Sequence, residues 1–378
     1  MQPVSQLLDA GRHAGDPLAD QTIQAIASGQ DIGLVNQVMR TLVENDDFPT
    51  AELPSPVMDY MERSSLLPSW ANLEQMQHGG QLFVRYGPEI VLMLFGASLP
   101  LLYAAHPGCE VLLATRQMTH NVHRRIIETG QFVIDVTEPR AWEPAGRGRL
   151  TSQKVRLMHA AIRHYLTKDQ RWREHWRADW GTPICQEDLL GTMLTFSVTI
   201  IQKLELSRIT LSQAEKESYL HLWKVVGYLL GVDEGRMPAD YEEAEALLAL
   251  WMQRNHRPND TSRRLMKAMI DFWYLRVPGR RFDRVTSGWC RLWIGDELAD
   301  AMGVPPFNWT RHLLNAQIRL WQAKDRLGDR SAPFQSLTRF WTRGLMQALM
   351  MVERDGQRPD FRIPEQLQAK WGLARPQT

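Results

Sequence analysis

Apolar residues recur at spacings of three and four along almost the whole chain, which is the period of α-helices that bury one face. Alternating β-branched residues, typical of strands, are confined to the short ITL run at 209–211. We therefore expect an all-α protein without a significant sheet. The periodicity predicts helices at 20–28, 31–43, 56–63, 72–86, 186–206, 212–230, 241–251, 261–274 and 308–327.

Helix starts carry residues that commonly cap helices. Ser212 followed by Glu215 forms a capping-box pattern, and Asp31, Asp240 and Thr261 are further candidate N-caps. No internal repeat or long flexible linker interrupts the pattern. One compact domain spanning residues 1–378 is the simplest organisation.

Composition limits the class of protein. The 378 residues are 44% hydrophobic and 23% charged, as in soluble globular proteins, and the net charge of +1 argues against a nucleic-acid partner. The three cysteines are too few and too widely spaced for a disulfide framework or a zinc knuckle. The first twenty residues show no basic segment followed by an apolar one, so we expect a cytoplasmic protein.

A run of 16 uncharged residues at 90–105 needs separate consideration. A membrane-spanning helix needs about 20 apolar residues. Gly96 and Pro100 interrupt the run, which therefore predicts a buried helix, a turn and a second buried helix. Stable membrane insertion is not expected.

The segment KVRLMHAAIR, at 154–163, places one histidine on the apolar stripe of a predicted helix. His159 shares this face with Val155, Met158, Ile162 and Leu166, whereas the basic residues fall mostly on the other sides. A neutral imidazole facing a cavity could bind a metal, haem iron included. The alternative is a core histidine hydrogen-bonded to a neighbour, which is the commoner case.

A second predicted helix, at 110–136, also carries polar groups on its apolar seam. Thr129 lies on that seam, and Arg125 and Glu128 lie beside it within one turn. An alternative is a local Arg125–Glu128 ion pair on a solvent-exposed flank, with Thr129 as an ordinary helix hydroxyl. The whole seam consists of Leu112, Thr115, Thr119, Val122, Ile126, Thr129 and Val133.

These two segments together make the chain resemble a known family. RRIIETGQFV at 124–133, the glycine-rich GRGR at 146–149 and KVRLMHAAIR resemble the catalytic domain of the latex-clearing proteins, or rubber oxygenases, a family that includes the oxygenase of mycophenolic acid biosynthesis. GDPLAD at 15–20, FGASLPLLYA at 95–104 and YLHLWKVVGYLLGV at 219–232 extend the resemblance over about residues 10–235.

The resemblance implies a globin-like helical core that encloses a b-type haem, with additional N- and C-terminal helices. It implies that His159 is the proximal iron ligand and that Arg125 and Thr129 belong to the haem-adjacent helix. Residues 267–378 match less well, and the motifs at 289–295 and 303–309 are expected to cover the pocket. Glu128 stands where rubber oxygenases have a lysine, which puts polyisoprene in doubt as substrate.

The implied reaction is O2-dependent cleavage of a C=C bond in a small, apolar, isoprenoid- or lipid-like substrate. Arg125 and Thr129 would stabilise negative charge, and Glu128 is a candidate base for an allylic proton. No motif identifies a redox partner. Two alternatives stay open: a haem-binding sensor or carrier without turnover, and a non-haem helical metalloprotein that uses His120 and His123 with Glu110 or Glu128.

Overall fold

The described part of the chain is helical and contains no strand, as the sequence predicts. The computed structural model describes residues 4–28, 53–114, 122–138, 140–143, 146–168, 173–274, 284–307 and 311–328. Within these ranges the one β-type pairing is an isolated antiparallel bridge between Ala105 and His256. The all-α class is confirmed.

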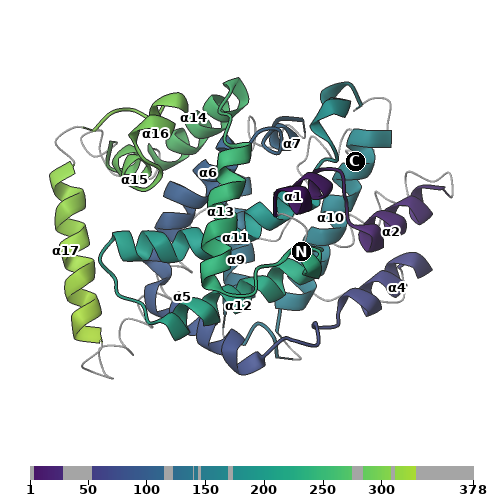
Figure 1. Cartoon of the computed structure of the whole chain (residues 1–378), viewed down its shortest axis with the longest axis horizontal. Coiled ribbons are helices and arrows are strands. Elements are labelled where there is room, and N and C mark those ends of the chain that lie inside the picture. Colours follow the sequence, from purple (N-terminus) through teal and green to yellow (C-terminus); the bar gives the residue numbers. More distant parts are fainter. Residues whose placement is uncertain are drawn as a thin grey trace, which may run out of the picture.

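The helices form a packed bundle in which α11 and α13 cross near the centre, α2 and α4 lie at one end and α17 at the other (Figure 1). The elements of the first half are α1 (Val4–Arg12), α2 (Pro17–Ser28), α4 (Ser55–Ser64), α5 (Leu73–Met93), the π-helix η2 (Leu94–Ser98), α6 (Leu99–Ala104), α7 (Glu110–Ala114), α9 (Val122–Thr137) and α10 (Gly148–Lys168). Those of the second half are the 3-10 turns η3 (Arg173–His175), η4 (Ala178–Trp180) and η5 (Glu234–Arg236), and the helices α11 (Gln186–Leu206), α12 (Gln213–Leu229), α13 (Tyr241–Asn255), α14 (Asp260–Tyr274), α15 (Arg284–Ile294), α16 (Asp296–Ala301) and α17 (Arg311–Gly328).

Most predicted helix starts agree with the structure. The capping box at Ser212 and Glu215 is present, and the Asp240 side chain accepts a hydrogen bond from the third residue of α13. Thr261 is not a cap, because Asn259 Oδ1 accepts the Ser262 backbone N–H at 3.0 Å and takes that role. The helix expected at 31–43, with its cap, lies outside the described residues.

The turn expected within residues 90–105 is wrong. The chain stays helical from α5 through the π-helix η2 into α6. Gly96 serves packing, because a Cβ on it would lie 2.6 Å from ring atoms of Trp293 on α15. Pro100 falls in the first turn of α6, where a missing N–H is tolerated. The distortion lies instead at Tyr86, two residues before Pro88, where φ is −121° and ψ is 22°.

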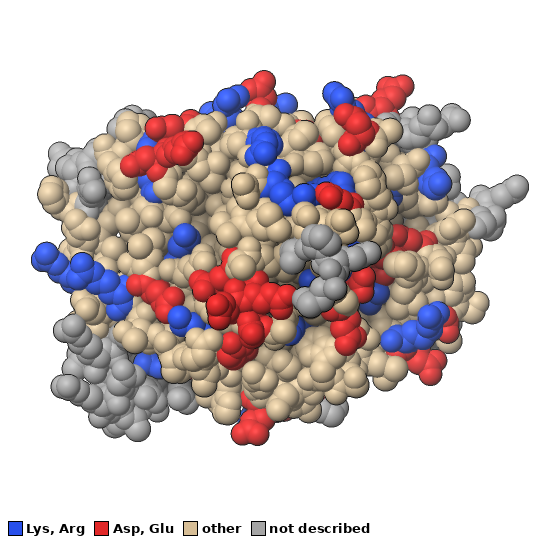
Figure 2. Space-filling view, in the orientation of Figure 1, with Lys and Arg blue, Asp and Glu red and all other residues tan. Residues whose placement is uncertain are grey.

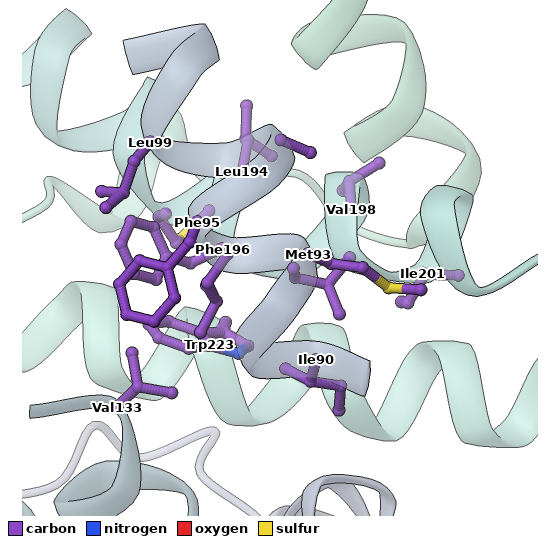
Figure 3. Packing of buried hydrophobic residues seen from close by; sticks show 14 of the residues in the cluster. Ile90, Met93, Phe95, Leu99, Val133, Leu194, Phe196, Val198, Ile201 and Trp223 are labelled. Atoms are coloured by element: carbon purple, nitrogen blue, oxygen red, sulfur yellow. The ribbon is translucent and has the colours of Figure 1, made fainter. Parts of the chain in front are cut away.

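The main hydrophobic core forms where α5, η2 and α6 pack against α11 and α12 (Figure 3). In that view Phe95, Phe196 and Trp223 lie close together, and the Phe196 and Trp223 ring centroids are 5.3 Å apart. A smaller core joins α2 and α4 to α10 through residues such as Ile23, Tyr60 and Leu157. The space between the two cores is where a ligand site can form.

Two segments are long and apolar enough to span a membrane, Leu73–Ala104 and Gln186–Leu206. In the first, 83% of the most apolar window is buried inside the protein, and in the second 72% is buried. These surfaces therefore pack within the protein's own core. The expectation that the chain does not insert stably into a membrane remains a prediction.

Charged side chains of both signs are spread over the molecular surface. On the face shown in Figure 2, acidic side chains gather near the middle, over α12 and α13 in the orientation of Figure 1. Asp240, Glu242 and Glu243 are exposed at the start of α13. Basic side chains are scattered on this face, which gives a polyanion no continuous surface to bind there.

We expect Gly79→Ala to destabilise the fold by about 1–3 kcal/mol, the range for inserting an extra carbon into a packed helix contact. A Cβ at Gly79 of α5 would lie 2.5 Å from the Ser218 carbonyl oxygen of α12, and backbone cannot move aside as a side chain can. Urea unfolding would measure the loss. Gly235→Ala is the control, because the nearest atom to its new Cβ is 3.6 Å away; equal midpoints for the two variants would contradict the close contact of α5 with α12.

Candidate functional site

A cavity of about 220 Å³ lies between the two cores. A single water needs only about 10–15 Å³ by the same measure, so the space suits a much larger ligand. Its wall is mainly apolar and comes from α6, α9, α10, α11, α12 and α13, with the loop before α7. The lining residues include Leu99, Tyr103, Gly108, Cys109, Ile126, Thr129, Met158, His159, Ile162, Asp188, Thr192, Met193, Phe196, Trp223, Gly227 and Trp251.

α10 brings His159 to this wall. The predicted stripe is confirmed, because Val155, Met158, Ile162 and Leu166 are all buried. His159 is half-buried and lines the cavity together with Met158 and Ile162. The imidazole therefore lies on the boundary between the smaller core and the cavity.

Two ion pairs hold α10 on either side of His159. Arg156 donates from Nε to Asp16 Oδ2 at 2.6 Å and from Nη2 to Asp16 Oδ1 at 2.7 Å. Arg163 donates from Nε to Asp20 Oδ1 at 2.7 Å and from Nη1 to the Ile184 carbonyl at 2.9 Å. The two arginines lie three residues before and four residues after His159, so they flank it on the helix. The GDPLAD motif at 15–20 therefore supplies both carboxylates, Asp16 and Asp20.

The loop before α2 also fixes the start of α11. Gln186 Nε2 donates at 2.8 Å to the carbonyls of Gly15 and Gly231, and its Oε1 accepts the Asp233 backbone N–H at 2.8 Å. Gly231 has φ of 94°, and a Cβ there would lie 2.4 Å from Asp16 Oδ2. One loop thus sets the positions of α2, α10 and α11.

α9 places Thr129 on the cavity wall beside Ile126. The helix expected at 110–136 is described as α7 and α9, and Thr115 and Thr119 lie outside the described residues. Arg125 belongs to α9, but its side chain is outside the described part. Glu128 is 4% exposed, which does not fit a solvent-exposed flank, yet it is not among the cavity-lining residues.

The donor set of the cavity fits a haem better than a free metal ion. One imidazole in an apolar wall is the usual arrangement of a proximal haem ligand. No group of three or more His, Cys, Asp and Glu residues that could hold an ion occurs within the described ranges. Glu110 accepts hydrogen bonds from Asn259 at 2.7 Å and Thr261 at 2.9 Å, so it is committed to the start of α14. His120 and the His123 side chain lie outside the description.

The described residues of the two C-terminal motifs expected to cover the pocket, 289–295 and 303–307, are not among those that line it. The described lining ends at Trp251. Trp289 and Trp293 of the 289–295 motif stack on each other with centroids 4.6 Å apart, and Trp289 also stacks on Trp321 of α17 at 4.9 Å. These large side chains therefore join α15 to η2 and α17.

Sequence reasoning missed the charged group in the cavity. Asp188 of α11 lines it, and Asp188 Oδ1 accepts a hydrogen bond from Arg12 Nη1 at 2.8 Å. An acidic residue in the first turn of a helix is usual, because it complements the helix dipole, so the pattern gave no signal. The partner Arg12 is 176 residues away in the sequence.

Comparisons with known proteins agree with this architecture. Residues 84–324 match a family model described as "ER-bound oxygenase mpaB/B'/Rubber oxygenase, catalytic domain". The rubber oxygenase of Streptomyces sp. (strain K30) is 27% identical over 231 residues, which are 61% of this chain and 56% of that protein. This chain thus matches little more than half the length of that relative.

A solved structure of the latex clearing protein LCP in the closed state has the same fold. Its TM-score is 0.75 at 23% sequence identity, and the match covers 94% of this chain and 95% of that one. The structural match therefore extends beyond residues 84–324, the segment that the family model matches.

We expect Asp16→Asn to destabilise the protein by about 3–5 kcal/mol, because it leaves the buried Arg156 guanidinium without a counter-charge. The unfolding midpoint in urea would report this loss. The control is Asp179→Asn, which removes an exposed partner of Arg177 and should leave the midpoint nearly unchanged. A small effect at Asp16, matching that of the control, would show that the pair does not hold α10 in place.

Proposed function

The chain belongs to the mpaB/rubber oxygenase catalytic-domain family, and on that premise we propose that it is a haem b-dependent oxygenase. The proposed reaction is O2-dependent cleavage of a C=C bond in a small, apolar, unsaturated substrate. The observation that carries the proposal is that His159 and Thr129, from separate family-like segments, line one apolar cavity. When bound, haem would supply an iron centre able to activate dioxygen.

His159 would hold the iron through its imidazole, and α10 orients that side chain. The two ion pairs at Arg156 and Arg163 keep the helix from rotating, because rotation would move a guanidinium into the apolar cavity. Fixing the direction of the imidazole would fix where His159 can hold the cofactor. The contact between α2 and α10 therefore sets the position of the His159 side chain.

The cavity wall would bind and orient the substrate. Leu99, Phe196 and Trp223 present apolar surface to an alkene and exclude water, which strengthens any polar interaction inside. The Thr129 hydroxyl can donate a hydrogen bond on the α9 side of the cavity. Arg125 of α9 is the proposed source of positive charge next to Thr129.

Glu128 is not assigned here as the base that removes a proton. Glu128 is buried on α9 but lies outside the cavity lining. That role, and a cytoplasmic location, stay predictions from the sequence. Glu128 at the position of the family's lysine supports a small substrate in place of polyisoprene.

We expect His159→Ala to lower haem content at least about tenfold, because loss of a metal ligand should weaken affinity at least as much as loss of its supporting residues. The pyridine haemochrome assay and the Soret band of purified protein measure this change. His78→Ala is the control, since His78 is exposed on α5 and remote from the lining. Full haem content and an unchanged spectrum in His159→Ala would refute the assignment.

Oxygen consumption distinguishes an oxygenase from a sensor or carrier. Haem-loaded protein should consume O2 when an unsaturated terpenoid is added, and mass spectrometry should show two carbonyl products. His159→Ala should consume none above the background of free haem. Haem binding without substrate-dependent consumption across terpenoids and unsaturated fatty acids would favour the sensor.

A further inference from the structure

Asp188 lines the cavity, and one of its carboxylate oxygens has no hydrogen-bond donor. Its side chain is 15% exposed, and Oδ1 accepts from Arg12 Nη1 at 2.8 Å. The other carboxylate oxygen, Oδ2, is buried and accepts no hydrogen bond from any described residue. A buried charged acceptor without a donor is unfavourable, so this oxygen is suited to a ligand group that donates.

Arg12 cannot turn to cover Oδ2, because its other nitrogens are occupied. Arg12 donates from Nε to Glu187 Oε2 at 2.9 Å and from Nη2 to Asn255 Oδ1 at 2.6 Å. These contacts fix the guanidinium on the side of Asp188 where α1 and α13 meet α11. Arg12 is therefore not available as a donor for Asp188 Oδ2.

Asp188 shares its guanidinium partner, Arg12, with Glu187. The ion pairs of this cluster join two guanidinium groups, of Arg12 and Arg254, to three carboxylates, of Asp9, Glu187 and Asp188. The negative charge of Asp188 also affects the neighbouring thiol of Cys185. Burial, and then the negative charge of Asp188, raise the pKa of Cys185 well above its usual value.

Gly108 packs directly against the carboxylate of Asp188. A Cβ at Gly108 would lie 3.1 Å from Asp188 Oδ1 and 3.4 Å from Oδ2, so a larger residue would cover the group. Gly108 and Asp188 both line the cavity.

The rest of the wall makes Asp188 distinctive. Among the described lining residues it alone carries a carboxylate. Thr192, next to it, donates its hydroxyl to the Asp188 backbone carbonyl at 2.8 Å and so is not a free donor for Oδ2. An apolar chamber with one anionic acceptor selects an apolar molecule that ends in a donor.

We propose that Asp188 binds the head group of the substrate, which is an apolar unsaturated molecule bearing a hydroxyl or an ammonium group. This inference rests on the proposed function and narrows its substrate class. A site built to bond a polar group rejects analogues that lack it, because its own polar atom is then left unpaired. Plain hydrocarbons, polymer included, are therefore poor ligands of this cavity.

The test compares ligands of one carbon skeleton on purified full-length protein by isothermal titration calorimetry. The probes are geraniol, geranylamine and geranyl methyl ether, which offer a hydroxyl, an ammonium and no donor. We expect the alcohol, the amine or both to bind about tenfold to a hundredfold more tightly than the ether, the range for a hydrogen bond to a charged group. Equal affinities, or no binding of any probe, would overturn the inference.

Asp188→Asn should remove this preference, because the amide keeps the shape of the side chain but loses its charge. Asp260→Asn is the matched control, since Asp260 also lies in the first turn of a helix but is 93% exposed and outside the cavity. A preference that survives Asp188→Asn would refute the assignment. If that variant does not fold, the ligand series on the unaltered protein decides the question.

The result is separable from the proposed function, because it is a binding measurement. Loss of the donor preference in protein that holds haem and consumes O2 would reject the Asp188 assignment alone. A clear donor preference in protein that binds no haem would reject the oxygenase proposal alone.

Discussion

The paired charges between α2 and α10 are the constraint on which the site depends. Asp16 and Asp20 lie four residues apart on one helix edge and meet Arg156 and Arg163 on the other. Buried ions are tolerated only when they are paired, so α10 has one rotational setting in which both guanidinium groups meet a carboxylate. That setting places His159 on the cavity wall. The apolar stripe alone would restrain the rotation less sharply, because hydrophobic contact is not directional.

The cavity exists because two cores meet without merging. The larger core is built around α5, α11 and α12, and the smaller one around α2, α4 and α10. Glycines bring the helices of the larger core close together. A Cβ at Gly191 would lie 2.0 Å from Trp251, and one at Gly227 would lie 2.8 Å from Met193 Sδ. Close packing on that side makes the wall rigid, so a ligand would meet a preformed surface.

The sequence predicted those features that depend on local spacing. The helix at 186–206, the capping box at Ser212 and the buried stripe around His159 all follow from residues within a few turns of one another. The π-helix at 94–98 could not be predicted, since an uncharged run shows no change of period and the Trp293 that packs on Gly96 is remote in sequence. The pairing of Asp16 with Arg156 was hidden for the same reason. Asp188 looked like an ordinary residue of a helix start.

The charge on the cavity wall decides what kind of apolar ligand is acceptable. Burying one isoprenoid methylene gains about 0.8 kcal/mol, whereas leaving a charged acceptor dry and unpaired costs about 1–3 kcal/mol or more. Asp188 Oδ2 is already buried and unpaired without a ligand, so a hydrocarbon leaves that penalty in place and must bury additional carbons to match a ligand that pairs this oxygen. A donor at one end of a short chain removes that penalty directly. The energetic balance favours a small molecule with one polar end in a chamber whose other walls are apolar.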